Sequence, residues 1–408
     1  MPKRTRREFL GRAAQLAATG LGAGLAAGCE NKQPVARKRE PTPAPRLASW
    51  EPGYLKLLRK GELARRADRL WKFMESCELC PRQCGVDRLA GAEGYCQASS
   101  TLEVASHQPH WGEEEPLVGD GGSGTIFLSN CSLRCVFCIN WEISQGGEGH
   151  ERSLEDLARM MLDLEARGCW NINIVTPTHY AAHVVKALVI AAEAGLRLPL
   201  VWNTCGWERL EILKLLDGVV DIYLPDCKYA ESAMADKYSS GADTYPEVTR
   251  KALLEMNRQV GVAQPATDGR MYRGLMIRHL VMPNDVGGSV KIVKWIAQHL
   301  PKNTYVNLMS QYRPMHKAHE YPRINRRITH AEFEYADVGL EVMAEATVEN
   351  SRFTTCRVGL FVHDTDDVVT VSGLLAENND EDGVVVVDAD LLATDLESRF
   401  NGGRGLYM

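Results

Sequence analysis

The chain has 408 residues, of which 45% are hydrophobic, and its formal net charge is −6 at pH 7. This length and apolar content suffice for one large core plus an accessory domain. The acidic balance argues against general affinity for nucleic acid. The chain contains 12 cysteines, and their spacings are typical of metal ligands rather than of a small disulfide framework. No stretch is long and apolar enough to predict a membrane-spanning helix.

The N-terminus has the features of an export signal. Arg6 and Arg7 precede residues 13–27, which carry no charge and consist mostly of Ala, Gly and Leu. This pattern resembles a twin-arginine signal peptide; the alternative is an ordinary basic terminus. Cys29 follows as a candidate lipidated cysteine, although Ala26 occupies the position where lipoprotein signals usually have Leu or Val. We therefore predict export to the periplasm, with a lipid anchor at Cys29 as one possible form.

The first cysteine cluster consists of Cys77, Cys80, Cys84 and Cys96, with the spacing C-x2-C-x3-C-x11-C. Four thiolates at this spacing can close a tetrahedral metal site or hold an iron-sulfur cluster. Bound zinc would stabilise the fold of the segment, whereas an iron-sulfur cluster or a rubredoxin-like iron would transfer electrons. The spacing predicts a metal site and leaves the choice of metal open.

From residue 124 onward, apolar runs typical of strands alternate with stretches typical of helices. Ser153 and Asp156 form a capping pair for the first of these helices, and Gly168 ends it. The expected strands are Thr125–Ser129, Asn171–Val175, Pro199–Thr204, Val219–Leu224, Gly274–Val281 and Thr304–Met309. The other expected helices are Tyr180–Ala194, Trp207–Leu216, 246–260 and Ser289–His299. This alternation predicts an α/β fold with parallel βαβ units, consistent with a partial (β/α)6 barrel whose functional residues collect at the C-terminal strand ends.

The first of these strands leads into Cys131, Cys135 and Cys138, which have the spacing C-x3-C-x2-C. Three thiolates can hold three irons of a four-iron, four-sulfur cluster, and a fourth iron then stays open to another molecule. The alternatives are a zinc loop or a structural cluster.

This triad motif resembles that of the radical S-adenosylmethionine (SAM) superfamily. Five later runs, together with C-E-L-C-P-R-Q-C-G-V-D-R, are similar to the pyruvate formate-lyase activating enzyme-like subfamily, over roughly residues 70–330. The five runs are N-I-V-T-P-T-H-Y, W-N-T-C-G-W-E, D-I-Y-L-P-D-C-K-Y, G-L-M-I-R-H-L-V-M-P and V-N-L-M-S-Q-Y-R-P. The resemblance implies that the triad ligates a [4Fe-4S] cluster whose open iron binds SAM. It also implies that an electron from a flavodoxin- or ferredoxin-type donor cleaves SAM to a 5'-deoxyadenosyl radical, which abstracts hydrogen from a protein or peptide.

Several further residues are candidates for the SAM pocket because they lie at or near predicted strand ends. The resemblance assigns Asp226 and Lys228 to the ribose and the carboxylate of SAM; a surface ion pair is the alternative. Phe137 is a candidate for stacking on adenine, or else for core packing. Thr178 stands where many superfamily members have a Gly-Gly-Glu run that receives the amino group of SAM. The remaining candidates are Asn203, Arg278 and His279, with core or barrel-lining roles as the alternative.

Beyond about residue 336 the resemblance fades. Residues 361–400 are heavily acidic, and three stretches have patterns typical of short strands: Arg357–Val362, Val368–Leu374 and Gly383–Asp388. The segment is predicted to be a small β-containing appendage, a partner-docking surface or partly disordered.

These features predict five segments and one principal function. The segments are an export signal at 1–29, a disordered linker at 30–50, a four-cysteine metal-binding region at 51–118, a radical SAM core barrel at 119–335 and an acidic extension at 336–408. The predicted function is that of a radical SAM enzyme resembling activators of glycyl radical enzymes. The alternatives are a maturase for an exported peptide or protein, and a non-catalytic iron-sulfur scaffold or electron-transfer protein. Export away from cytosolic SAM favours the scaffold, or else action in the cytoplasm before export, whereas the triad and the D-C-K run favour an enzyme.

Overall fold

The computed structural model describes residues 50–263, 265–329 and 332–333, together with short strands between residues 347 and 407. The predicted export signal, Cys29 and nearly all of the predicted linker lie outside the described residues. Among the described helices, none is long and apolar enough to cross a membrane.

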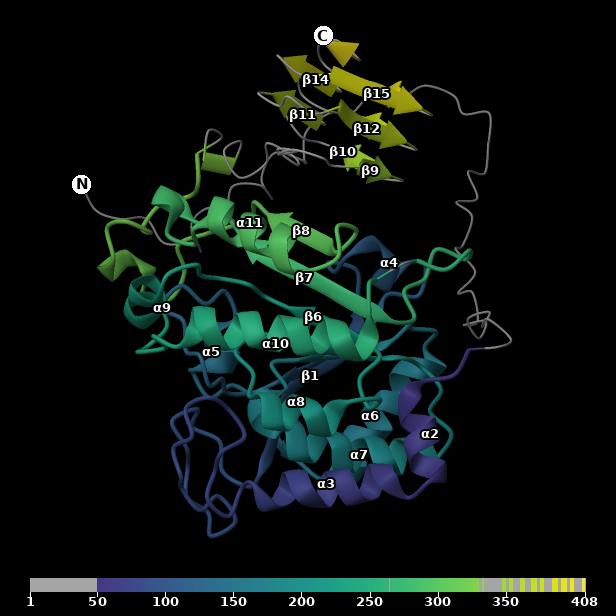
Figure 1. Ribbon diagram of the computed structural model, residues 1–408. Helices are drawn as coiled ribbons and strands as arrows, with labels where there is room; N and C mark the ends of the chain where they lie inside the picture. Colours follow the sequence, from purple (N-terminus) through teal and green to yellow (C-terminus); the bar gives the residue numbers. More distant parts are fainter. Residues whose placement is uncertain are drawn as a thin grey trace, which may run out of the picture. The chain divides into compact units, whose positions relative to one another are not determined.

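A mixed eight-stranded sheet forms the centre of the core, in the order β3-β1-β2-β4-β5-β6-β7-β8 (Figure 1). Six of its strands run parallel: β2 (Ser123–Leu128), β4 (Ile172–Val175), β5 (Leu200–Thr204), β6 (Ile222–Pro225), β7 (Gly274–Leu280) and β8 (Tyr305–Met309). They lie where the sequence predicts them. β1 (Leu102–His110) and β3 (His150–Arg152) add an antiparallel edge that the sequence analysis did not predict. Closure of the six parallel strands into a partial barrel stays a prediction.

The two faces of the sheet carry different side chains, because successive residues of a strand point to opposite sides. On one face, the register aligns Ile126, Ile174, Trp202 and Tyr223 across four strands. All four are fully buried in the main core, together with the helices. On the other face, a small apolar cluster forms around Val201, Ile222, Leu224 and Met276. This second face also carries Asn203 and Arg278, since each lies two residues beyond a member of that cluster in its strand.

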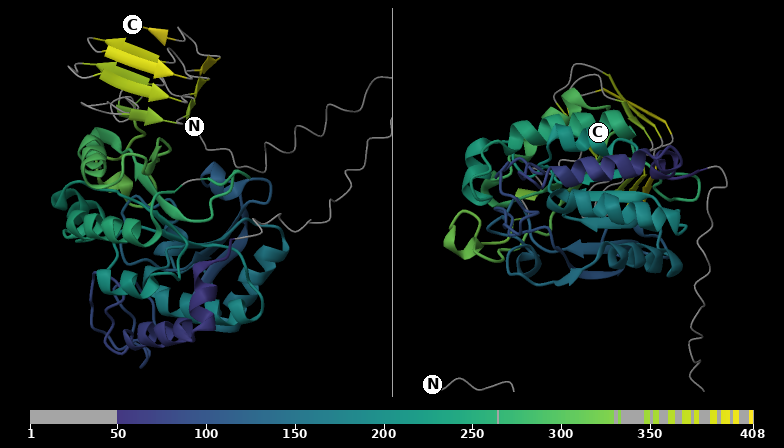
Figure 2. Two further views of the ribbon diagram at one scale, coloured as in Figure 1. Left: turned by 45° about the vertical axis from the view of Figure 1, so that its right-hand side comes forward. Right: turned by 90° about the horizontal axis from the view of Figure 1, so that it is seen from below.

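Most of the helices contribute side chains to the main core, whereas Leu117, from a short helix, belongs to the cluster on the other face. The bounds of the helices are α2 (Gly53–Arg59), α3 (Glu62–Lys72), α4 (Glu115–Val118), α5 (Trp141–Ser144), α6 (Leu154–Ala166), α7 (Ala181–Glu193), α8 (Leu210–Leu216), α9 (Ser232–Tyr238), α10 (Tyr245–Val260) and α11 (Ser289–His299). The predicted capping box of Ser153 and Asp156 begins α6. α7 packs against both α3 and α6, and α8 packs against α10 (Figure 2). Helices α2, α3, α4, α5 and α9 were not predicted, and the four-cysteine segment lies between α3 and β1 without regular secondary structure of its own.

The C-terminal region forms three short parallel sheets, with the strand orders β9-β12-β15, β10-β13-β16 and β11-β14-β17. The strands are β9 (Thr347–Glu349), β10 (Arg352–Thr354), β11 (Leu360–His363), β12 (Val368–Ser372), β13 (Leu375–Glu377), β14 (Val384–Val387), β15 (Asp390–Thr394), β16 (Glu397–Arg399) and β17 (Leu406–Tyr407). Each strand pairs in parallel with the strand three positions later, for example Val368 with Asp390. The chain therefore visits the three sheets in turn, as in a parallel β-helix. The three predicted strands overlap β11, β12 and β14, but the coiled arrangement was not predicted.

Candidate active site

The triad loop, residues 131–138, follows directly from the end of β2 and turns sharply. Asn130 and Arg134 have positive φ angles of 71° and 51°, a conformation that asparagine adopts more readily than most residues. The backbone N–H of Asn130 donates to the carbonyl of Ile143 at 3.0 Å, and that of Val136 donates to the carbonyl of Tyr238 at 3.0 Å. These bonds fix the loop at both ends, at the C-terminal edge of the parallel strands.

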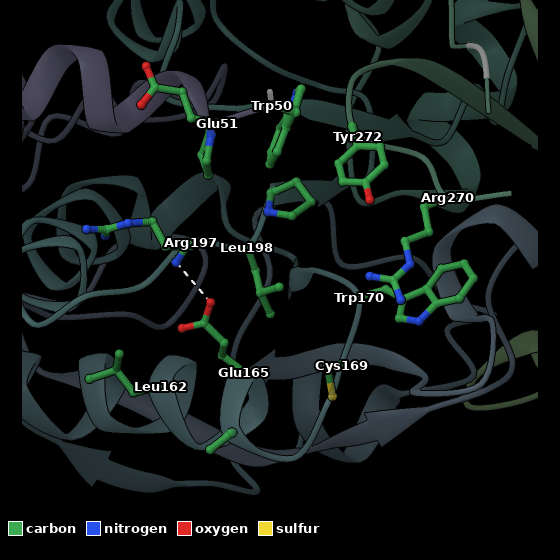
Figure 3. A pocket seen from close by; sticks show the side chains of 13 residues that line it. Trp50, Glu51, Leu162, Glu165, Cys169, Trp170, Arg197, Leu198, Arg270 and Tyr272 are labelled. Atoms are coloured by element: carbon green, nitrogen blue, oxygen red, sulfur yellow. Dashed lines mark hydrogen bonds between the residues drawn. The ribbon is translucent and has the colours of Figure 1, made fainter. Parts of the chain in front are cut away.

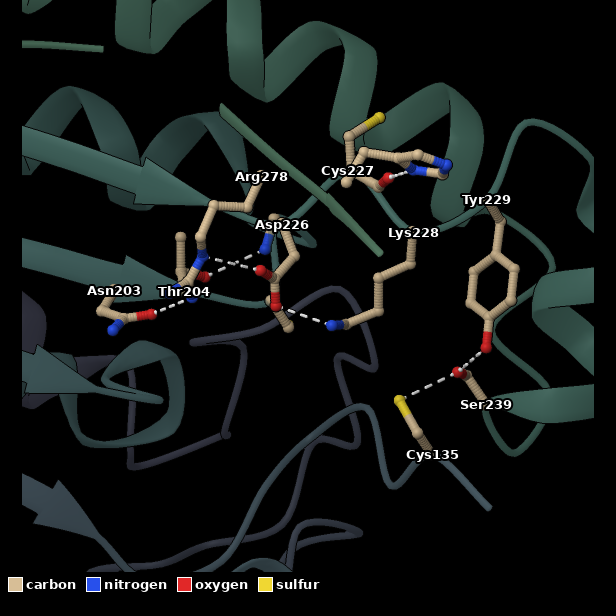
Figure 4. Close-up of polar contacts among 12 residues, drawn as sticks. Cys135, Asn203, Thr204, Asp226, Cys227, Lys228, Tyr229, Ser239 and Arg278 are labelled. Atoms are coloured by element: carbon tan, nitrogen blue, oxygen red, sulfur yellow. Dashed lines mark hydrogen bonds and ion pairs between the residues drawn. The ribbon is translucent and has the colours of Figure 1, made fainter. Parts of the chain in front are cut away.

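Of the triad cysteines, Cys135 is buried in an apolar cluster, and Cys131 and Cys138 are partly buried against it. Burial raises the pKa of the Cys135 thiol to about 12, and its charge would be opposed by those of Cys138 and Cys131. Burial also raises the pKa of Cys138. The Sγ of Cys135 accepts a hydrogen bond from Ser239 at 3.1 Å (Figure 4). Such thiols ionise when a bound metal supplies the positive charge.

The triad has the donor chemistry of a cluster site. Its three side chains are all thiols, and they share one loop at the C-terminal edge of the parallel strands. An iron-sulfur cluster places each thiolate on a different iron, so its ligands are more widely spaced than the ligands of one tetrahedral ion. The three thiols that share this loop are suited to that arrangement.

A network of buried charges lies beside the triad, at the ends of β5, β6 and β7 (Figure 4). Lys228 Nζ donates to Asp226 at 2.6 Å, and Arg278 Nε donates to the other oxygen of Asp226 at 3.1 Å. Arg278 also donates to Asn203 at 2.5 Å and to Glu113 at 3.1 Å. Asn203 in turn contacts Glu113 at 3.4 Å. The structure thus joins four of the predicted pocket residues with one residue, Glu113, that was not predicted.

The charges of this network determine the ionisation of its acids. Burial alone would raise the pKa of Asp226, but Lys228 and Arg278 outweigh burial and hold that pKa below its usual value. Burial raises the pKa of Glu113, and Arg278 opposes the rise. Asp226 therefore stays ionised, and Lys228 carries its positive charge towards Cys135, whose thiolate it stabilises.

Comparison with known proteins identifies the family. The profile of the Radical SAM superfamily matches residues 125–252. The uncharacterised protein MJ0674 of Methanocaldococcus jannaschii is 32% identical over 274 residues, which cover 65% of this chain and 74% of that protein. The chain belongs to the radical SAM superfamily. A second protein of that organism, the uncharacterised protein MJ0808, is 22% identical over 266 residues, or 60% of this chain and 73% of that protein.

Membership of the radical SAM superfamily implies a [4Fe-4S] cluster, SAM and SAM-dependent radical chemistry. The matched residues include the triad, Asp226 and Lys228. Neither relative has a name that states a substrate, so the geometry of the site is the main guide to the function of this radical SAM protein.

A second polar group surrounds Glu208, another residue that was not predicted. One oxygen of its fully buried carboxyl accepts hydrogen bonds from Thr178 at 2.8 Å, Thr204 at 2.6 Å and Trp202 at 3.1 Å. The other oxygen has no hydrogen-bond partner. Burial raises the pKa of Glu208 while these three donors lower it. Thr178 is therefore engaged with Glu208 and lies outside the network of Asp226. The signal in the sequence was the end of the W-N-T-C-G-W-E run, where Glu208 follows β5.

Two predicted pocket residues face other parts of the protein. His279 lies next to Arg278 but points to the opposite side of β7, where its ring contacts the carbonyl of Cys227 at 2.6 Å and Ser289 at 2.8 Å. It connects β7 to α11 and is separated from the charge network. Phe137 belongs to the triad loop and is buried in an apolar cluster, with its ring 5.8 Å from that of Tyr312.

One cavity of about 310 Å³ lies far from these residues in the fold (Figure 3). Trp170, Leu198 and Tyr272 line it, and each precedes a parallel strand. Arg270 stacks on Trp170 at 4.4 Å, and the backbone N–H of Arg197 donates to Glu165 at 3.0 Å. The cavity therefore lies at the N-terminal strand ends, where barrel proteins place stabilising rather than catalytic residues.

Proposed function

We propose that this protein is a radical SAM enzyme that abstracts a hydrogen atom from a protein or peptide, in the manner of an activator of a glycyl radical enzyme. The observation that carries the proposal is the position of the buried Lys228, which binds Asp226 and lies close enough to Cys135 to interact with its charge. A superfamily domain that had lost its activity would have no need for two buried cations at this position, because burying charge is costly. The predicted partial barrel belongs to the same proposal.

In this proposal, Cys131, Cys135 and Cys138 would hold the cluster, and SAM would bind next to it. When bound and reduced, the cluster supplies the electron that cleaves SAM into methionine and a 5'-deoxyadenosyl radical. Lys228 provides a cation for the SAM carboxylate, and Asp226 accepts hydrogen bonds from the ribose hydroxyls. Phe137 and its apolar neighbours exclude water from the reacting groups.

The other parts of the proposal concern partners and location. A flavodoxin- or ferredoxin-type protein supplies the electron, and the twin-arginine signal directs the folded protein to the periplasm, with Cys29 as a candidate lipid anchor. Cys77, Cys80, Cys84 and Cys96 bind a second metal centre. If the export signal is used, an exported peptide or protein becomes the natural substrate, which makes a maturase the second candidate function.

The test is an anaerobic assay on the full chain. The protein is reconstituted with iron and sulfide, reduced and given SAM, and 5'-deoxyadenosine is quantified. We expect the wild type to form 5'-deoxyadenosine and Cys135→Ala to form none. Cys169→Ala is the control, because Cys169 is a buried cysteine outside both clusters, and it should form as much as the wild type. A wild type that binds iron and SAM but forms no deoxyadenosine would favour the scaffold or electron-transfer function.

A further inference from the structure

We propose that Cys77, Cys80, Cys84 and Cys96 bind a second [4Fe-4S] cluster, held next to the triad loop. The radical SAM profile does not extend to these residues. This inference rests on the second metal centre of the proposed function and names the group that it holds, and its test does not depend on whether the triad cleaves SAM.

The fold brings the four thiols together although the segment has no regular secondary structure. Cys77, Cys80 and Cys96 are buried, whereas Cys84 is exposed. A methyl group at Gly94 would lie 3.3 Å from the Sγ of Cys84 and 3.5 Å from that of Cys96. These two thiols therefore face the same narrow space, which only a glycine leaves open.

Backbone hydrogen bonds fix this arrangement. The N–H of Cys77 donates to the carbonyl of Val86 at 2.8 Å, and the N–H of Gly85 returns a bond to the carbonyl of Cys77 at 3.0 Å. The Sγ atoms of Cys80 and Cys96 each accept a backbone N–H from the residue two positions later. Hydrogen bonds to sulfur favour the thiolate form, which is the form that binds metal.

A buried cation lies beside the thiols. The side chain of Arg88 is fully buried, and its Nη1 lies 3.9 Å from the Sγ of Cys77 and 2.6 Å from the carbonyl oxygen of His179. The guanidinium group of Arg88 thus places one positive charge beside the anionic ligand set that a bound cluster would have.

The arrangement fits an iron-sulfur cluster better than zinc. Three of the cysteines lie within eight residues and the fourth is remote, a pattern found among iron-sulfur proteins, whereas structural zinc sites commonly use two separated pairs.

Arg82 connects this segment to the triad loop. It lies between Cys80 and Cys84, and its Nε donates to the carbonyl of Ser132 at 3.0 Å. Its guanidinium group stacks on Tyr95, which precedes Cys96, at 4.1 Å. A single side chain thus spans from the four cysteines to the residue after Cys131, which places the two metal centres side by side.

The test counts metal in a chain that lacks the triad. The full chain carrying Cys131→Ala, Cys135→Ala and Cys138→Ala is reconstituted anaerobically, and its iron, sulfide and zinc are measured. We expect about four irons and four sulfides per chain, with visible absorption that bleaches on reduction, and about eight irons in the wild type. Adding Cys80→Ala should abolish the iron of the triple variant, whereas adding Cys169→Ala should leave it unchanged.

Two outcomes would overturn the proposal. One is a triple variant that binds no iron, and the other is a triple variant that binds one zinc per chain in place of iron. Should the Cys80→Ala chain fail to fold, the metal content of the triple variant still decides. The triple variant has no triad to cleave SAM, so its iron content is independent of the proposed enzymatic function.

Discussion

Arg278 is the residue on which the charge network of the site depends, and its replacement by methionine tests the network directly. The guanidinium group binds two carboxylates, those of Asp226 and Glu113, and the side-chain oxygen of Asn203. Its side chain is only 14% exposed, and the side chain of Glu113 is 9% exposed. Methionine keeps much of the volume and removes all three hydrogen bonds.

The expected loss follows from the charges that the substitution leaves behind. Asp226 keeps Lys228 as its partner, but Glu113 keeps only the amide of Asn203. Removing one partner of a buried ion pair typically costs about 3–5 kcal/mol, because an uncompensated charge stays buried. We therefore expect Arg278→Met to lower the free energy of unfolding by about this amount.

Urea unfolding followed by circular dichroism measures the effect. The matched control is Lys251→Met, which removes an exposed pair with Glu247 on α10, and should leave the stability unchanged within error. Adding Glu113→Gln to Arg278→Met should recover part of the loss, because it removes the buried charge. A loss below about 1 kcal/mol, or no recovery in the double variant, would refute the role given to Arg278.

Two further predictions concern acid stability and backbone geometry. Burial lowers the pKa of His179 to about 3 and of His183 to about 4, so below pH ~6.5 each of these histidines binds a proton in the unfolded chain that it does not bind in the folded chain. Each should therefore lower the stability by up to about 1.4 kcal/mol per pH unit as the pH drops from 6 to 5, and His183→Gln should reduce the slope by about this amount; an unchanged slope would contradict the burial argument. Gly206 has a φ of 81°, and a Cβ there would lie 2.0 Å from the carbonyl oxygen of Asp226. We expect Gly206→Ala to lower the free energy of unfolding by about 2–5 kcal/mol. Gly91→Ala is the control, because Gly91 also has a positive φ but has open space around it, and it should lower this free energy by about 1–2 kcal/mol. Equal losses in urea unfolding would show that the contact with Asp226 is unimportant.

The sequence predicted the parts of the site that are local in the chain. The triad and the D-C-K run lie within short stretches that follow strands, so motif spacing and alternation of elements located them. The sequence analysis did not predict Glu113 because Glu113 contacts Arg278 from 165 positions away in the chain. Glu113 follows the antiparallel strand β1, and the many polar residues of β1 gave little indication that a strand was present. Such contacts depend on how the sheet is assembled, and composition and spacing do not report that.

Two features of the structure could have been inferred more closely from the sequence, namely the side of β7 on which His279 lies and the repeat of the C-terminal strands. His279 was grouped with Arg278, although adjacent residues of a strand face opposite sides, and the structure places His279 against Ser289 of α11. The C-terminal strands recur at nearly regular intervals, and pairings such as Val368 with Asp390 would have emerged from a search for internal repeats. The W-N-T-C-G-W-E run placed Glu208 just after a strand, but its burial among three donors became visible only in the fold.

The most direct test of the central claim is whether the triad presents an iron to SAM. The full chain with Cys77, Cys80, Cys84 and Cys96 replaced by alanine keeps only the triad, so its reduced form gives the electron paramagnetic resonance spectrum of one cluster. We predict that adding SAM changes this spectrum. Adding adenosine, which lacks the methionine part of SAM, should leave the spectrum unchanged. A chain with about four bound irons whose spectrum is unaffected by saturating SAM would contradict the account.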